Sequence, residues 1–185
     1  MTHTTIADDL RSWSKHLLEV PSPHLNGLPP CPYARKAWAE NKVKVIECAD
    51  VLKSALVYRD LVTQYDLVVV ASYVIPDPEV MQETIEQYND TYAKNDLYFM
   101  LFHPEYGAEE AELDFLYDTD WVSDIEDEYC MVFIQSLSKV DDASLQLEGK
   151  GYYNAFPKDE YETLVLNRRR KRRNDEAKSN DQEDN

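Results

Sequence analysis

The stretch Asp66-Leu-Val-Val-Val-Ala-Ser-Tyr-Val-Ile75 decides the fold of this 185-residue chain. It is almost continuously apolar and rich in β-branched residues, a pattern typical of a strand buried on both faces of a sheet. Pro76-Asp-Pro78 follows it and turns the chain. We therefore expect residues 66–75 to form a central strand.

Further strands and helices are predicted on either side of this stretch. Lys42-Val-Lys-Val-Ile-Glu47 alternates like a strand with one solvent-facing side, and residues 97–102 and 129–134 are short apolar strands. Helical spacing or helix-start signals mark residues 6–20, 32–41, 50–62, 78–94, 138–147 and 158–173. Strands alternating with helices in a chain this short predict an α+β fold. The expected form is a compact two-layer sandwich with a four-stranded sheet, ferredoxin-like as the first choice.

The charge balance limits the partners of the protein. The chain has 19 Lys and Arg against 36 Asp and Glu, a formal net charge of −17, and 43% hydrophobic residues can supply a core. Residues 167–185 hold 7 basic and 5 acidic residues, which leaves 12 and 31, or −19, for residues 1–166. We expect residues 1–166 to form one domain and residues 167–185 to be a basic helix end and a disordered tail. General nucleic-acid or anionic-membrane binding is disfavoured, because both partners are polyanions.

No targeting segment or common cofactor motif is recognisable. The first ten residues are polar, and Leu67-Val-Val-Val-Ala71 is too short to span a membrane. Cys31, Cys48 and Cys130 are scattered, which favours a reducing cytoplasm over a disulfide framework. GxGxxG, CxxC, HExxH and GxSxG are absent, so we predict no cofactor and no metal. Asp118-Thr-Asp120 lacks the later glycine and acid of a calcium loop.

The turn Cys31-Pro-Tyr-Ala-Arg35 is the first candidate site. A cysteine before a helix-starting proline lies where free N–H groups favour a thiolate, and Arg35 could add to this effect. Residues 31–47 resemble the active-site region of glutaredoxins, with Ala34 in place of the second cysteine. That resemblance implies at most a monothiol form, and a glutaredoxin would need a strand directly before Cys31.

A broader resemblance covers most of the chain. Asn26-Gly-Leu-Pro-Pro-Cys-Pro-Tyr-Ala34, Phe102-His-Pro-Glu-Tyr106 and Asn154-Ala-Phe-Pro157 follow a Trp-containing first helix. In this order they resemble an uncharacterised family of small bacterial proteins with a Cys-Pro-Phe-Ala turn and a Phe-His-Pro-Asp-Tyr motif. This chain has two extra residues before Cys31, and its continuation after the His-Pro motif differs. The resemblance implies no known reaction.

His103 is the second candidate, because it follows directly on an apolar strand. Ligands gather beyond strand carboxyl ends in open sheets, and a histidine there can act as a general base. One hypothesis is thus a thiol-dependent enzyme with an unknown small-molecule substrate. Its catalytic residues would be Cys31, Arg35 and His103, and its pocket would be shaped by Tyr33, Glu105 and Asn154. The alternative for each residue is a purely structural role.

An acidic-aromatic segment, residues 105–129, carries the second hypothesis. No Lys or Arg occurs between Lys94 and Lys139, whereas twelve acids do. Aromatic residues including Tyr106 and Trp121 are interleaved with these acids, as in binding surfaces that anchor a partner. The segment would make the protein a non-enzymatic binder of a basic protein, or a DNA mimic. A solvated acidic loop is the structural alternative.

The hexad Arg168-Arg-Arg-Lys-Arg-Arg173 is the last candidate. Six consecutive cations could bind nucleic acid or serve as a nuclear address. The favoured interpretation is that they cap the last helix and pair loosely with the acidic body or tail.

Overall fold

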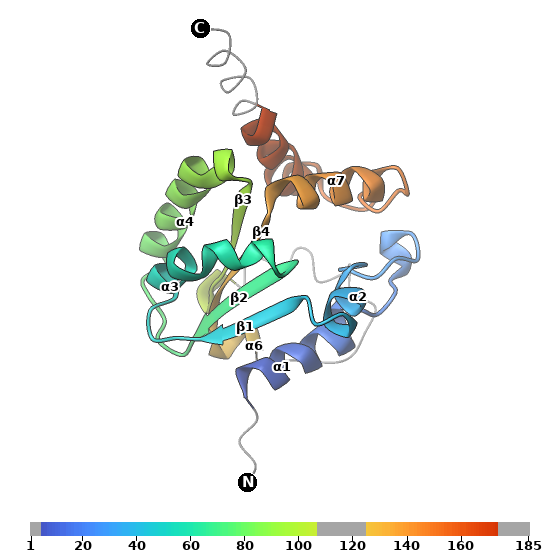
Figure 1. Cartoon of the computed structure of the whole chain (residues 1–185). Coiled ribbons are helices and arrows are strands. Elements are labelled where there is room, and N and C mark those ends of the chain that lie inside the picture. The colour runs from blue at the N-terminus through green and yellow to red at the C-terminus, as the bar shows by residue number, and fades with distance from the viewer. Residues whose placement is uncertain (1–4, 107–124, 174–185) are drawn as a thin grey trace, which may run out of the picture.

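The strand that the sequence places at the centre of the sheet does lie between two others. The computed structural model describes residues 5–106 and 125–173, and their sheet has four strands in the order β1-β2-β4-β3 (Figure 1). The strands are β1 (Val43–Glu47), β2 (Leu67–Ser72), β3 (Leu97–Phe102) and β4 (Cys130–Ser136). β1 and β2 are parallel, whereas β4 is antiparallel to both β2 and β3. The predicted α+β class and four-stranded sheet are confirmed.

The helices lie close to the predicted ranges, and side chains cap several of them. Asp50 accepts a hydrogen bond from the N–H of Lys53, which confirms the predicted cap. The helices are α1 (Ile6–Trp13), α2 (Ala34–Ala39), α3 (Val51–Tyr58), α4 (Pro78–Tyr92), α6 (Ile125–Glu128), α7 (Leu137–Glu148) and α8 (Lys158–Tyr161). Turns of π-helix extend α1 over Ser14–Leu18 and α8 over Glu162–Leu166, and residues 167–173 are again helical. No helix in the described part of the chain is long and apolar enough to cross a membrane.

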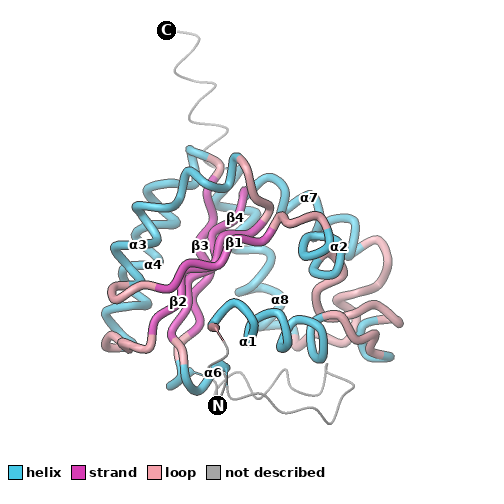
Figure 2. The backbone as a smooth tube through the Cα atoms, turned by 60° about the horizontal axis from the view of Figure 1, so that its bottom comes forward, coloured by secondary structure: helices cyan, strands magenta, loops and turns pink. Residues whose placement is uncertain are grey.

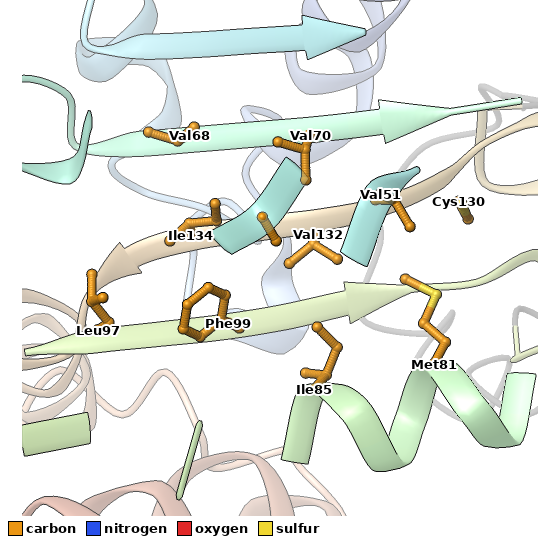
Figure 3. Packing of buried hydrophobic residues seen from close by; sticks show 11 residues of the cluster. Val51, Val68, Val70, Met81, Ile85, Leu97, Phe99, Cys130, Val132 and Ile134 are labelled. Carbon is orange, nitrogen blue, oxygen red and sulfur yellow. The ribbon is translucent and has the colours of Figure 1, made fainter. Parts of the chain in front are cut away.

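Helices cover both faces of the sheet. On one face α3 and α4 bury Val68 and Val70, as Figure 3 shows around Met81 of α4. On the other face α1 and α6 bury Val69 and Ala71. Figure 2 shows the sheet between these two groups of helices. The continuously apolar sequence of β2 is explained by this burial on both faces.

This arrangement corrects the expected layering and topology. The ferredoxin-like pattern joins its second and third strands without a helix, whereas here α4 lies between β2 and β3. A two-layer sandwich would leave one sheet face free of helices, and the side chains of Val69 and Ala71 would then be exposed. Both are buried, with exposed fractions of 2% and 0%.

The basic hexad pairs with the folded body. Arg168 Nε donates to Asp141 Oδ1 at 2.7 Å, and both side chains are almost fully buried. The remaining ion pairs of the hexad join Arg169 to Glu148, Arg170 to Glu162, Lys171 to Asp90 and Arg172 to Asp142. Apart from Arg170–Glu162, which lies within the last helix, these pairs attach that helix to α7 and α4. The sequence predicts that the hexad pairs loosely, whereas Arg168–Asp141 is a buried pair. Residues 174–185, where the disordered tail is predicted, lie outside the described residues.

Candidate binding site at the carboxyl edge of the sheet

β1, β2 and β3 run in the same direction, because β4 is antiparallel to both of its neighbours. Their carboxyl ends therefore lie at one edge of the sheet, together with the amino end of β4. Three buried side chains that can form hydrogen bonds lie there, those of Ser72, His103 and Cys130. This carboxyl edge is where open sheets commonly bind ligands.

His103 fixes two turns at this edge. Its Nε2 lies 3.0 Å from the carbonyl oxygen of Pro76, and its Nδ1 lies 3.1 Å from the backbone nitrogen of Glu105. Because Nδ1 accepts the N–H of Glu105, the ring bonds as the tautomer with its proton on Nε2. Glu105 is exposed, and it contacts the ring through its backbone N–H. His103 thus joins the loop after β2 to the turn after β3.

The side chains of Ser72 and Cys130 form hydrogen bonds with the backbone of Val74. Ser72 Oγ accepts the N–H of Val74 at 2.9 Å, and Cys130 Sγ donates to the carbonyl oxygen of Val74 at 3.3 Å. Burial, with a smaller effect of Cys48, raises the pKa of Cys130 to about 11. The thiol therefore stays protonated at neutral pH and remains a donor.

Tyr129 also contacts this loop, through the ring of Tyr73. The rings of Tyr73 and Tyr129 pack edge to face with centroids 4.8 Å apart. Tyr129 donates its hydroxyl proton to Asp9 Oδ2 at 2.9 Å. Burial above all, and the hydrogen bonds with Tyr73 and Asp9, raise the pKa of Tyr129 far above its ordinary value. The hydroxyl of Tyr129 therefore stays protonated at neutral pH and donates a hydrogen bond to Asp9 of α1.

These contacts leave four large apolar side chains exposed. Tyr73, Val74, Ile75 and Val80, which we call the β2–α4 patch, are 56%, 61%, 43% and 53% exposed. The other exposed large apolar residues in the described ranges are divided among the Cys31 turn, α3, α7 and the last helix. Three of these side chains lie in the loop after β2 and the fourth lies in the first turn of α4, and such grouping indicates a contact surface more strongly than single exposed residues do.

The surroundings of the patch are acidic. No Lys or Arg occurs between Arg59 and Lys94, nor between Lys94 and Lys139. The exposed acids next to the patch in sequence, or at the same sheet edge, are Asp77, Glu79, Glu105 and Glu128. A cationic partner would therefore meet little local repulsion.

Cys31 lies in another part of the molecule. Its N–H donates to the carbonyl oxygen of Leu18 at 2.9 Å, and α2 leads from it to the amino end of β1 (Figure 1). His103 follows the carboxyl end of β3, at the opposite sheet edge, and a five-residue strand separates these edges by about 17 Å. Cys31 and His103 thus adjoin opposite ends of the parallel strands, and their pairing as a nucleophile and its base stays a prediction.

Arg35 bonds to Glu19. Its Nη2 donates to the backbone oxygen of Glu19 at 3.3 Å, and its Nε lies 3.5 Å from Oε2. Burial favours a higher pKa for Glu19, but hydrogen bonds from Arg11, Ser14 and Arg35 outweigh it and lower that pKa. Glu19 therefore stays ionised beside Cys31.

The surroundings of Cys31 disfavour a thiolate. Burial is the largest effect and raises the pKa of the thiol, and the charge of Glu19 adds to the rise. The N–H groups of Tyr33 and Ala34 act in the opposite direction without reversing it. The sulfur is therefore a protonated thiol at neutral pH.

Alkylation of Cys31 should accordingly be slow at neutral pH. We expect its iodoacetamide rate to rise with pH through a midpoint above the ordinary value for cysteine, about 8.5. Because the pKa is raised, the stabilising effect of the neutral thiol is present at low pH and lost at alkaline pH. Peptide-resolved mass spectrometry from pH 6 to 10, with urea-unfolded protein as the reference, measures the profile. A midpoint below 8.5 would contradict this description.

Two of the family-like motifs do meet in space. Tyr152 donates its hydroxyl proton to the carbonyl oxygen of Pro30, and Asn26 Nδ2 donates to that of Lys150 at 2.7 Å. Asn154 lies against Gly151, where a Cβ would come within 2.8 Å of its Nδ2. The Cys31 turn is thus attached to the loop that carries Asn154, away from His103. Tyr33 is exposed there.

The acidic-aromatic segment is described only at its ends. Trp121 lies outside the described residues, and only the backbone turn Pro104–Tyr106 places Tyr106. Within the described residues, no three His, Cys, Asp or Glu side chains are grouped to hold a metal ion.

Comparisons of this chain with protein-family models, curated proteins and solved structures returned no match.

The β2–α4 patch is not predicted from the sequence, because residues 73–75 continue the apolar run of the predicted strand. The strand ends at Ser72, whose side chain takes the N–H of Val74. Apolar residues followed by Pro76-Asp-Pro78 were the available signal, because proline restricts the residue before it and removes a ladder donor.

Proposed function

We propose that the protein is a non-enzymatic interaction protein that binds a basic protein segment at the carboxyl edge of its sheet. The observation that carries this proposal is the exposed β2–α4 patch, whose backbone is fixed by buried side chains. The acidic surroundings select the partner, which presents apolar anchors flanked by lysine or arginine. This proposal moves the contact from the predicted acidic-aromatic segment to the adjoining loop.

Preorganisation favours such binding. Val74 and Pro76 are held through their backbone atoms by Ser72, Cys130 and His103, so little conformational entropy is lost when a partner is bound. The valine and isoleucine side chains can then contribute their apolar area, about 1.5 kcal/mol or more each when fully buried.

A fluorescent twelve-residue peptide of alternating lysine and leucine tests the proposal. Anisotropy should show saturable binding that weakens at least about tenfold from about 50 to about 500 mM salt. A peptide with glutamate in place of lysine should not bind. The double variant Val74→Ser and Ile75→Ser should weaken binding about tenfold or more, because two apolar anchors are lost.

The control is Val57→Ser, since Val57 is 62% exposed but lies on α3. This substitution should change the affinity less than about twofold. Failure of the lysine peptide to bind, equal binding of the glutamate peptide, or equal losses in both variants would contradict the proposal.

A further inference from the structure

β1 is the outermost strand on one side of the sheet, and its outward side carries backbone groups that have no neighbouring strand. Lys42 accepts from Leu67 through its carbonyl oxygen, and Cys48 donates to the carbonyl oxygen of Ala71. Even-numbered residues of β1 therefore direct their backbone groups to β2, and the odd-numbered residues Val43, Val45 and Glu47 direct theirs outward. Within residues 5–106 and 125–173, no hydrogen bond reaches these outward N–H and C=O groups.

The other edge of the sheet is blocked. Asn89 of α4 bonds to the outer side of β3: its Nδ2 donates to the carbonyl oxygen of Phe99 at 2.9 Å, and its Oδ1 accepts the N–H of Phe99 at 2.8 Å. The side-chain amide thereby takes the place of a neighbouring strand. The edge of β3 is thus interrupted at its centre, whereas all the outward groups of β1 remain available for strand pairing, and such edges are templates for another chain.

We propose that β1 pairs with β1 of a second copy of this chain, antiparallel and about a two-fold axis through Val45. In this register Val45 lies opposite Val45 of the second copy, and Val43 lies opposite its Glu47. All the outward donors and acceptors of both strands then pair, because residues directly opposite exchange N–H···O=C bonds at these positions. The mixed sheet continues from one copy into the other.

The charges at the two ends of β1 favour pairing with a second copy of β1 over pairing with an unrelated strand, because they are opposite in sign. Lys42 and Lys44 lie toward the amino end of β1, and Glu47 and Asp50 lie toward its carboxyl end. Antiparallel pairing brings the basic end of each strand beside the acidic end of the other. Because Asn89 blocks β3, the association closes at two copies and does not extend into a fibre.

Residue-resolved amide exchange on the wild-type protein tests the pairing. Protection of the Val43, Val45 and Glu47 amides should rise with protein concentration from about 10 µM to about 1 mM, as mass action requires. Protection of the Lys44 and Ile46 amides, already bonded to β2, should not change. Sedimentation over the same range should show the mass rising toward twice that of one chain.

The variant Val45→Pro removes the central outward N–H without breaking a bond to β2. Proline is tolerated where an edge N–H faces solvent, and the association should weaken about tenfold or more. Val45→Thr keeps the N–H and the branched shape, and should associate like the wild type.

Salt separates this association from the proposed partner binding. Two chains of net charge −17 repel each other, so added salt should strengthen self-association while it weakens binding of the lysine peptide. Several results would overturn the pairing: a mass independent of concentration, protection outside residues 43–47 only, or equal association of Val45→Pro. Protection of β1 that appears only when the lysine peptide is added would assign the edge to a partner strand instead.

Discussion

Replacing Arg168 by methionine is expected to lower the free energy of unfolding by about 3 to 5 kcal/mol. The guanidinium is the partner of Asp141, whose side chain is only 3% exposed. Asp141 Oδ2 already has no hydrogen-bond partner among the described residues. Without Arg168 the carboxylate would be a buried and uncompensated charge. Urea unfolding at pH 7, followed by tryptophan fluorescence, measures the loss.

Arg170→Met is the matched control from the same hexad. Arg170 pairs with Glu162, but both side chains are about half exposed, so its removal should cost about 1 kcal/mol or less. Combining Arg168→Met with Asp141→Leu should restore much of the stability, because no buried charge is left unpaired. Equal losses for Arg168→Met and Arg170→Met would show that the hexad is not docked as described.

Val69→Asp and Val70→Asp are each expected to cost about 4 kcal/mol or more and to abolish cooperative folding. The two residues are neighbours in β2 with side chains on opposite faces, and their exposed fractions are 2% and 0%. A carboxylate at either position would enter an apolar layer without a partner. Thermal unfolding followed by far-ultraviolet circular dichroism measures the effect.

The control for these substitutions lies on β1. Lys44 is exposed, so Lys44→Asp should change the free energy of unfolding by about 0.5 kcal/mol or less. A mild effect of Val69→Asp alone would mean that the face covered by α1 and α6 is open, as in the two-layer sandwich that the sequence first suggested.

The strands were predictable because their pattern is local. The apolar run of β2 and the alternation of β1 report how many faces each strand buries, and Asp50 reports where α3 begins. The order of the strands is not local. β4 pairs with both β2 and β3, and no property of residues 130–136 alone specifies which neighbours they take. The ferredoxin-like expectation was wrong for another reason, because the helix predicted over residues 78–94 lies between β2 and β3, where that pattern has none.

The candidate site was predictable only in part, and for a related reason. His103 stands out in the sequence, but its partners are the backbone atoms of Pro76 and Glu105, which a residue pattern does not place. Cys31 stands out for its proline, yet the chain direction puts it at the other sheet edge. Chemically distinctive residues are recognisable in the sequence, whereas the pairing between strands decides which of them meet.

Amide chemical shifts of the labelled protein, recorded while the lysine–leucine peptide is added, test the proposed binding site most directly. We predict that the largest saturable changes fall on residues 72–80 and on Tyr129 and Cys130, because the peptide covers the β2–α4 patch. Changes confined to Cys31–Arg35 or to Arg168–Arg173, or no saturable change in any amide, would contradict the account.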